Sequence, residues 1–155
     1  MRSVVEGEKH FTASVWIVSK GQPKKALLLH HRKFDKWMQP GGHIEKFENP
    51  VEAAIREVKE ETGVDINFLA DEINKLDEVG SLLPVPEYLQ EQVIPSYGDE
   101  PAHFHLDMQY VVEVDEQEIV HNIQESHDIG WFTLEEVLKL PIYKDTGIIL
   151  TKLLG

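Results

Sequence analysis

The chain of 155 residues has no cysteine, which excludes a disulfide framework, a thiolate nucleophile and a thiolate-based zinc site. Basic residues are scarce as well. Lys and Arg number 15 against 28 Asp and Glu, which gives a formal net charge of −13. Because nucleic acid binding depends on Lys and Arg that neutralise phosphates, this charge argues against a long nucleic acid as partner. A small phosphorylated ligand remains compatible, since metal ions can mask charge locally.

Long apolar runs are also missing. No stretch approaches the roughly 20 apolar residues that span a bilayer. Residues 1–9 lack the basic start and apolar stretch of a signal peptide. We therefore expect no membrane partner and a cytoplasmic location. The length, with 41% hydrophobic and 28% charged residues, predicts one domain over residues 1–155.

Strand-like and helix-like patterns alternate irregularly along the chain. Strands are expected at 11–19, 26–30, 64–70 and 103–114, the first two as a hairpin, with loops at 37–42 and 93–102. Residues 71–91 follow no clear pattern. A helix is expected at 50–62, bounded by Asn49 as N-cap and Gly63 as stop. Further helices are expected after Thr133, whose capping box closes with Glu136, and at 145–154. Together these patterns predict an α/β fold with helices packed on a sheet.

The helix at 50–62 has two distinct faces. At about 100° per residue, one arc is largely apolar and collects Val51, Ala54, Ile55, Val58 and Thr62. Glu57, Glu60 and Glu61 fall on a second arc, because spacings of three and four bring helical side chains together. Oxygen-rich clusters suit hard cations, Mg²⁺ above all where phosphate oxygens complete its shell. The alternative for the triplet alone is a solvated acidic face.

The segment from Gly42 to Val64, GHIEKFENPVEAAIREVKEETGV, resembles the Nudix box position for position. That motif is G-x5-E-x7-R-E-U-x-E-E-x-G-U, with U a bulky aliphatic residue. The specified positions are held by Gly42, Glu48, Arg56, Glu57, Val58, Glu60, Glu61, Gly63 and Val64. A complete match over so many positions is a strong signal. The resemblance to the Nudix hydrolase family implies an α/β/α sandwich with a mixed β-sheet between helices.

The resemblance also implies roles for individual residues. Its metal ligands would be Glu57, Glu60 and Glu61 with the carbonyl of Gly41, holding Mg²⁺, for which Mn²⁺ could substitute. Gly41 and Gly42, without Cβ atoms, allow the backbone a close approach to metal or phosphate. Glu48 and Arg56 would form a structural ion pair that fixes the loop against the helix. The motif does not decide which glutamate acts as base. Glu125, six residues before Trp131, stands where relatives place a further ligand or the base; otherwise it is a solvated loop carboxylate.

The implied reaction is attack of water on a phosphorus of a diphosphate linkage in a nucleoside diphosphate joined to another moiety. A second hypothesis is a Nudix fold that binds a nucleotide or nucleotide sugar without cleaving it. Degraded boxes are frequent in that class, whereas this box is intact. A prenyl diphosphate isomerase would need a catalytic cysteine, and the chain has none. Hydrolysis is therefore the favoured function.

Four residues outside the box are candidates for contacts with a small nucleotide-type substrate. His103 and His105 alternate with Asp107 along one strand and share a face, so they could bind a second metal or the substrate, or simply make that face polar. Arg32 belongs to a basic stretch at 30–36 that could meet phosphate or be solvated. Trp37 could stack on a base or pack in the core. A homodimer is possible through the apolar stretch at 79–89, which could equally cover the core.

Overall fold

A mixed β-sheet forms the centre of the computed structural model, which describes residues 3–155. Its main path runs β3-β2-β1-β8-β7, while β4 also pairs with β1 and β9 with β2. The strands are β1 (Lys9–Ser19), β2 (Lys25–His31), β3 (Trp37–Met38), β4 (Gly41–His43), β7 (Tyr88–Ile94), β8 (His103–Val114) and β9 (Ser126–Thr133). β1 and β8 are parallel over their full paired length and the other pairs are antiparallel. The expected hairpin of β1 and β2 and the strand at 103–114 are confirmed.

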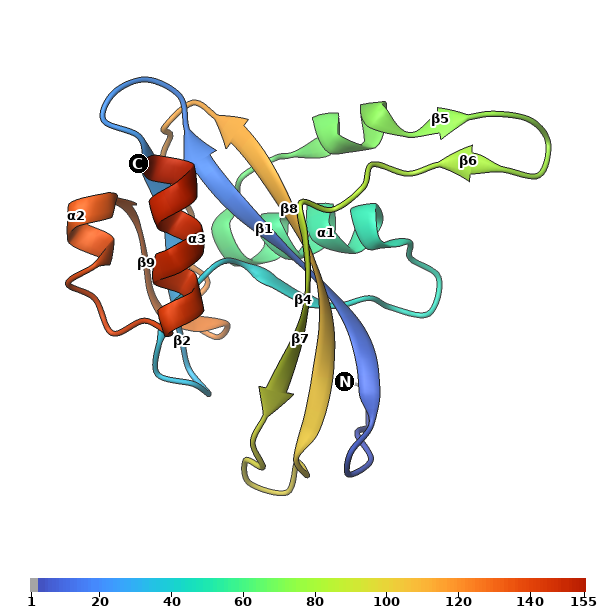
Figure 1. Cartoon of the computed structure of the whole chain (residues 1–155), viewed down its shortest axis with the longest axis horizontal. Helices are drawn as coiled ribbons and strands as arrows, with labels where there is room; N and C mark the ends of the chain where they lie inside the picture. The colour runs from blue at the N-terminus through green and yellow to red at the C-terminus, as the bar shows by residue number, and fades with distance from the viewer. Residues whose placement is uncertain (1–2) are drawn as a thin grey trace.

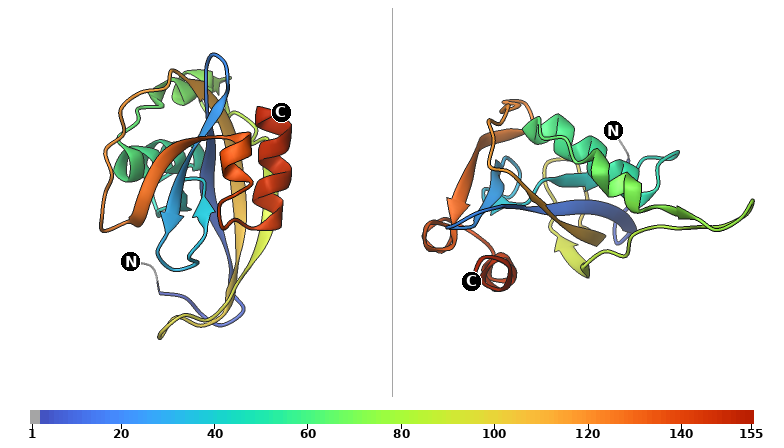
Figure 2. Two further views of the ribbon diagram at one scale, coloured as in Figure 1. Left: turned by 90° about the vertical axis from the view of Figure 1, so that its left-hand side faces the viewer. Right: turned by 90° about the horizontal axis from the view of Figure 1, so that it is seen from above.

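Helices cover both faces of this sheet (Figures 1 and 2). α1 (Pro50–Thr62) lies on one face, and α2 (Leu134–Val137) and α3 (Lys144–Leu154) lie on the other. Both predicted helical segments near the end of the chain are present, and Thr133 forms the expected capping box with Glu136. The α/β/α arrangement is confirmed. No described helix has the length and apolar character needed to cross a membrane.

Alternation along β1 divides the interior into two cores. Val15 and Ile17 point toward α1, whereas Trp16 points toward α3. Strand geometry explains this, because successive side chains project to opposite faces. The α1 core also contains Val51 and Val58. Two apolar layers therefore hold the sheet from both sides and fix the strand ends that carry the site.

α1 has the boundaries that the sequence predicts. The Asn49 side chain accepts a hydrogen bond from the Glu52 N–H, and the Asn49 N–H donates one to the Glu52 carboxylate. Such a capping box satisfies donors that a helix start leaves unpaired. At the other end Gly63 has φ 76°, a left-handed conformation that glycine adopts without steric cost. The position and length of α1 are thus encoded locally.

Two expectations between these elements are wrong. Residues 64–70, expected as a strand, contain the start of the 3₁₀ helix η1 (Asn67–Glu72). The Asp65 carboxylate accepts from the Asn67 N–H at 2.8 Å and turns the chain. Ile66 and Leu69 are then both buried at a spacing of three. The expected loop at 37–42 contains β3, which pairs with the nearby β2, and the start of β4, which pairs with the more distant β1.

The segment at 71–91 forms a small hairpin, β5 (Asn74–Lys75) and β6 (Ser81–Leu82), and then enters β7. In Figure 1 the hairpin projects away from the sheet. Several apolar side chains of this segment are exposed, among them Val79 in the hairpin (97%) and Val85 after it (87%). The stretch at 79–89 therefore leaves several apolar side chains at the surface, while its Tyr88 packs against the core on the α3 side.

Candidate active site

The turn into β4 brings two glycines against the acidic face of α1. The Gly41 N–H donates a hydrogen bond to Glu61 Oε1 at 2.8 Å. Gly42 faces Glu57, and a Cβ placed on Gly42 would lie 2.6 Å from Glu57 Cδ. A larger residue at position 42 would therefore displace that carboxylate. The absence of a side chain at Gly42 lets the backbone and the Glu57 carboxylate pack in direct contact.

The Arg56 guanidinium contacts several carboxylates at this site. Its Nε and Nη2 donate to the two carboxylate oxygens of Glu48 at 2.6 and 2.9 Å. Its Nη1 donates to Glu57 at 2.9 Å and to Glu60 at 3.3 Å, and Nη2 also reaches the His43 carbonyl at 3.0 Å. A guanidinium suits this arrangement because its planar fork presents several donors in fixed directions. Arg56 thus joins the loop before α1 to the carboxylates on α1.

Glu57 and Glu61 are held in surroundings that disfavour their charged forms. Burial raises the pKa of Glu57 to about 7, although the hydrogen bond from Arg56 opposes the shift. Burial and the neighbouring Glu57 charge raise the pKa of Glu61 to about 9, with the Gly41 N–H opposing. Glu60 is exposed. A bound cation would stabilise the charged forms of both carboxylates and reduce the repulsion between them. Their ligand atoms are oxygens, the donors that hard divalent cations prefer.

Glu125 lies near enough to act electrostatically on this group, since its charge contributes to the raised pKa values of both Glu57 and Glu61. Its side chain is exposed. Its loop is fastened to the end of α1, where the Val120 N–H donates to the Thr62 carbonyl at 2.9 Å. The position agrees with the expected approach of Glu125 to the cluster, while its role as ligand or base stays a prediction.

A buried polar network covers the sheet face next to β4. Asp107 is 4% exposed and accepts hydrogen bonds from the hydroxyls of Thr12 and Ser14, both at 2.7 Å. Gln109 donates to Asp107 at 3.1 Å and to Gln90 at 2.9 Å. Burial raises the pKa of Asp107 against the opposing effect of these donors. The network fixes the side chains beneath the adjoining pockets.

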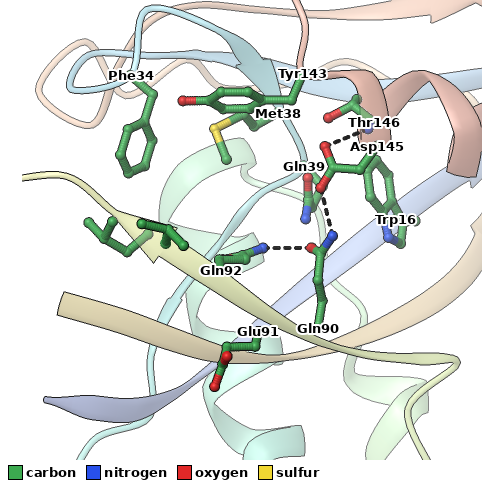
Figure 3. A pocket seen from close by; sticks show the side chains of 12 residues that line it. Trp16, Phe34, Met38, Gln39, Gln90, Glu91, Gln92, Tyr143, Asp145 and Thr146 are labelled. Atoms are coloured by element: carbon green, nitrogen blue, oxygen red, sulfur yellow. Dashed lines mark hydrogen bonds between the residues drawn. The ribbon is translucent and has the colours of Figure 1, made fainter. Parts of the chain in front are cut away.

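Two adjoining pockets open on this face. One, shown in Figure 3, combines aromatic and apolar walls with amide groups and is lined by Trp16, Phe34, Met38, Gln39, Gln90, Glu91, Gln92, Val93, Ile94, Tyr143, Asp145 and Thr146. In that view Gln92 donates to Gln90, and Gln90 to Asp145. The second shares Phe34, Met38, Gln39 and Gln92 with the first and reaches Gly41 and Gly42. The two pockets are therefore neighbours, and the second one places the glycines that contact Glu57 and Glu61 at its wall.

The four substrate-side candidates have different environments. His103 and His105 line the second pocket. Burial lowers the pKa of His105 to about 3, so its ring is neutral. Arg32 is exposed and donates to the Ile123 carbonyl in the loop of Glu125. Trp37 is 9% exposed in the core on the α3 side, against Phe132, and lines neither pocket.

Sequence reasoning missed several residues of this region. The glutamines of the first pocket, Gln39, Gln90 and Gln92, come from segments that carry no recognised motif. His10 and His43 lie beside His105, on strands whose pairing the sequence does not reveal. The alternation of His103, His105 and Asp107 was the one available signal for this face.

Comparison with known proteins agrees with this geometry. Residues 8–153 match the family model described as NUDIX domain. A protein named probable DHNTP pyrophosphohydrolase from Lactococcus lactis subsp. cremoris is 32% identical over 111 residues, covering 72% of this chain and 57% of that protein. Human diphosphoinositol polyphosphate phosphohydrolase 3-alpha is 30% identical over 139 residues, covering 87% and 70%. The chain thus spans little more than half of the Lactococcus protein.

A solved structure gives the same result at the level of the fold. The crystal structure of a NUDIX-family hydrolase from Clostridium perfringens superposes with a TM-score of 0.72 at 30% identity, covering 94% of this chain and 95% of that one. The family model matches nearly the whole chain, and the sheet order, the two helical layers and the motif at 42–64 agree with that match. The chain belongs to the NUDIX domain family.

Proposed function

We propose that this protein is a Mg²⁺-dependent Nudix hydrolase that cleaves a phosphoanhydride bond by attack of water on phosphorus. The observation that carries the proposal is the cluster of carboxylates on α1, where half-buried Glu57 and buried Glu61 have raised pKa values and contact Gly42 and Gly41, respectively. Bound Mg²⁺ would neutralise charge on the diphosphate oxygens and orient the attacking water. Mn²⁺, which prefers similar ligands, would be a substitute.

The chain's own residues would divide the work. Glu57, Glu60 and Glu61, with the Gly41 carbonyl, would hold the cation. Arg56, fixed by Glu48 at 2.6 Å, would keep Glu57 and the loop before α1 in place. Glu125 is the candidate base, because its carboxylate is exposed and borders the cluster. A base in that position would take the proton from water as the new P–O bond forms.

A small nucleotide-type substrate agrees best with the two pockets. Phe34 and Tyr143 offer aromatic surface to a flat ring, and Gln39, Gln90 and Gln92 offer donors and acceptors to its edge. The two substrates in the relatives' names, DHNTP and diphosphoinositol polyphosphate, differ in charge. A net charge of −13 disfavours a multiply phosphorylated inositol. We therefore place a heterocyclic diphosphate or triphosphate first.

The experiment is a screen for phosphate release by the purified protein, with Mg²⁺ and with a chelator. The panel comprises nucleoside triphosphates, a pterin triphosphate, ADP-ribose, dinucleoside polyphosphates, nucleotide sugars and a diphosphoinositol polyphosphate. Coupled enzymes distinguish pyrophosphate from monophosphate products. The proposal expects metal-dependent turnover of a heterocyclic substrate. Binding of such a compound without turnover in Mg²⁺ would instead favour the non-catalytic Nudix binding module.

Three further expectations belong to this proposal. Residues 1–155 would act as one domain, and the protein would be cytoplasmic, which cell fractionation tests. A homodimer would form through the stretch at 79–89, where Val79 and Val85 are exposed. Sedimentation of the wild type at twice the chain mass, with the double variant Val79→Asp, Val85→Asp at the single-chain mass, would support the dimer. Identical single-chain masses would exclude it at the concentration used.

A further inference from the structure

Three neighbouring strands bring histidines together on one side of the sheet. The parallel register of β1 and β8 places His10 directly opposite His105. β4 pairs with the other edge of β1, with His43 opposite Thr12, two residues from His10. Residues opposite each other, and those two apart along a strand, share a face. The strand pairing therefore brings together the imidazoles of His10, His43 and His105, which are far apart in the sequence.

The rings are close enough to share one ligand. The ring centroids of His10 and His43 are 4.6 Å apart, those of His10 and His105 5.0 Å, and those of His43 and His105 5.2 Å. One nitrogen from each ring lies within 4.8 Å of the others. Ligands around a tetrahedral zinc with Zn–N distances of about 2.1 Å are about 3.4 Å apart. Small rotations of the rings would close this difference.

The surroundings favour a ligand for these rings. His10 is 2% exposed, and His105 Nε2 is buried without a hydrogen-bond partner among residues 3–155. Buried polar atoms are normally satisfied by protein, water or an ion. His103 packs against the same group, 5.0 Å from His10, and its Nδ1 is 2.8 Å from the Pro101 carbonyl.

We propose that His10, His43 and His105 form a transition-metal site, of the kind that binds Zn²⁺, separate from the carboxylate site on α1. Imidazole nitrogens suit zinc and similar ions, whereas Mg²⁺ prefers oxygen. The two sites would therefore select different cations. The proposal does not depend on the hydrolytic function.

The site would also be linked to the catalytic loop. The His43 ring belongs to the histidine group, while the His43 carbonyl accepts a hydrogen bond from Arg56 at 3.0 Å. His43 and His105 line the pocket that reaches Gly41 and Gly42. An ion held by these rings would join β4 to β1 and β8, and it would be reachable from that pocket. Its binding should therefore raise the melting temperature.

The test is calorimetric titration of the full chain with Zn²⁺, after treatment with a chelator and in excess Mg²⁺ so that the carboxylates are occupied. The wild type should bind about one equivalent. His43→Gln and His105→Gln should each weaken Zn²⁺ binding more than about 100-fold. Loss of a residue that only contacts a metal ligand typically weakens metal binding by less than this. His127→Gln, an exposed histidine outside the group, and Glu61→Gln, on the other site, should bind as the wild type does.

NMR of the histidine rings gives a readout that needs no variant. Zn²⁺ should shift the ring signals of His10, His43 and His105, which are three of the eight histidines. The proposal is overturned if no Zn²⁺ binds in excess Mg²⁺, if both histidine variants bind as the wild type, or if only Glu61→Gln loses binding. The hydrolytic screen is independent of each of these outcomes.

Discussion

Among the residues of the site, Arg56 makes the largest set of interactions with carboxylates. It binds both oxygens of Glu48 and one oxygen each of Glu57 and Glu60. Glu48 responds with a lowered pKa, chiefly through the hydrogen bond from Arg56. Removing the guanidinium would leave three carboxylates next to each other without their cation. Its contribution should therefore exceed that of an ordinary surface ion pair.

Arg56→Ala should lower the free energy of unfolding by roughly 2 kcal/mol, the order of one or two hydrogen bonds between charged groups. Arg56→Lys should lose less, because it keeps the charge but not the fork. Denaturant unfolding measures both. The control is Lys139→Ala, which removes an exposed pair with Glu135 and should cost under about 1 kcal/mol. Equal losses for Arg56→Ala and Lys139→Ala would refute the structural role of Arg56.

At the scale of elements, the contact between β4 and α1 positions the carboxylates. The two glycines of β4 meet different neighbours. A Cβ on Gly41 would lie 2.5 Å from the Ala13 carbonyl oxygen and from Ser14 Cβ, both on β1. A Cβ on Gly42 would instead meet the carboxylate of Glu57, the mobile end of a side chain. The same substitution should therefore have different consequences at adjacent positions.

Gly41→Ala should destabilise the fold by about 1–3 kcal/mol, because β1 and β4 must separate. Gly42→Ala should change stability by less than about 1 kcal/mol, yet lower kcat by about 100-fold, since Glu57 is moved from its position. Thermal unfolding and turnover of the substrate found in the screen separate the two effects. A Gly42→Ala variant with wild-type kcat would show that the position of Glu57 is unimportant.

The elements also show which parts of the fold the sequence can predict. Both ends of α1 are set by neighbours in sequence, so the sequence alone identifies Asn49 as its N-cap and Gly63 as its stop. Residues 64–70 could not be assigned correctly, because apolar residues at 64, 66 and 69 fit a strand or a 3₁₀ turn. The Asp65 hydrogen bond and the adjacent core decide between them.

The same division applies to the site. The carboxylates on α1 lie within one short motif, whose helical periodicity is enough to bring them together. The histidine group depends on the register of β4, β1 and β8, and no local pattern specifies that register. His43 even occupies an unspecified position of the box. The alternation of His103 and His105 indicated the face, but not the partners His10 and His43.

For the whole molecule, the raised carboxyl pKa values make stability depend on pH. Glu57 and Glu61 bind protons in the folded protein up to about pH 7 and 9, against an ordinary value of 4.5. Between these limits the folded state carries more protons than the unfolded state. The free energy of unfolding must then fall as pH rises. The contribution is fully present below about pH 4.5 and is lost as pH passes through the folded-state pKa values.

We therefore expect the metal-free protein to melt at a lower temperature at pH 9 than at pH 6. Mg²⁺ competes with these protons, so the rise in melting temperature that it produces should be larger at the higher pH. Differential scanning calorimetry with and without Mg²⁺ measures both trends. Glu61→Gln is the control and should reduce the pH dependence. A metal effect equal at both pH values would place the cation elsewhere.

In the proposed reaction, the carboxylates of α1 hold the cation that hydrolysis requires. The most direct measurement of this role is kcat for wild type and Glu61→Gln in saturating Mg²⁺, on the substrate found in the screen. Glutamine keeps the shape of the protonated Glu61 side chain, so Glu61→Gln should fold normally. Its kcat should fall by about 100-fold or more. A folded Glu61→Gln variant with wild-type turnover would contradict the assignment of the metal site.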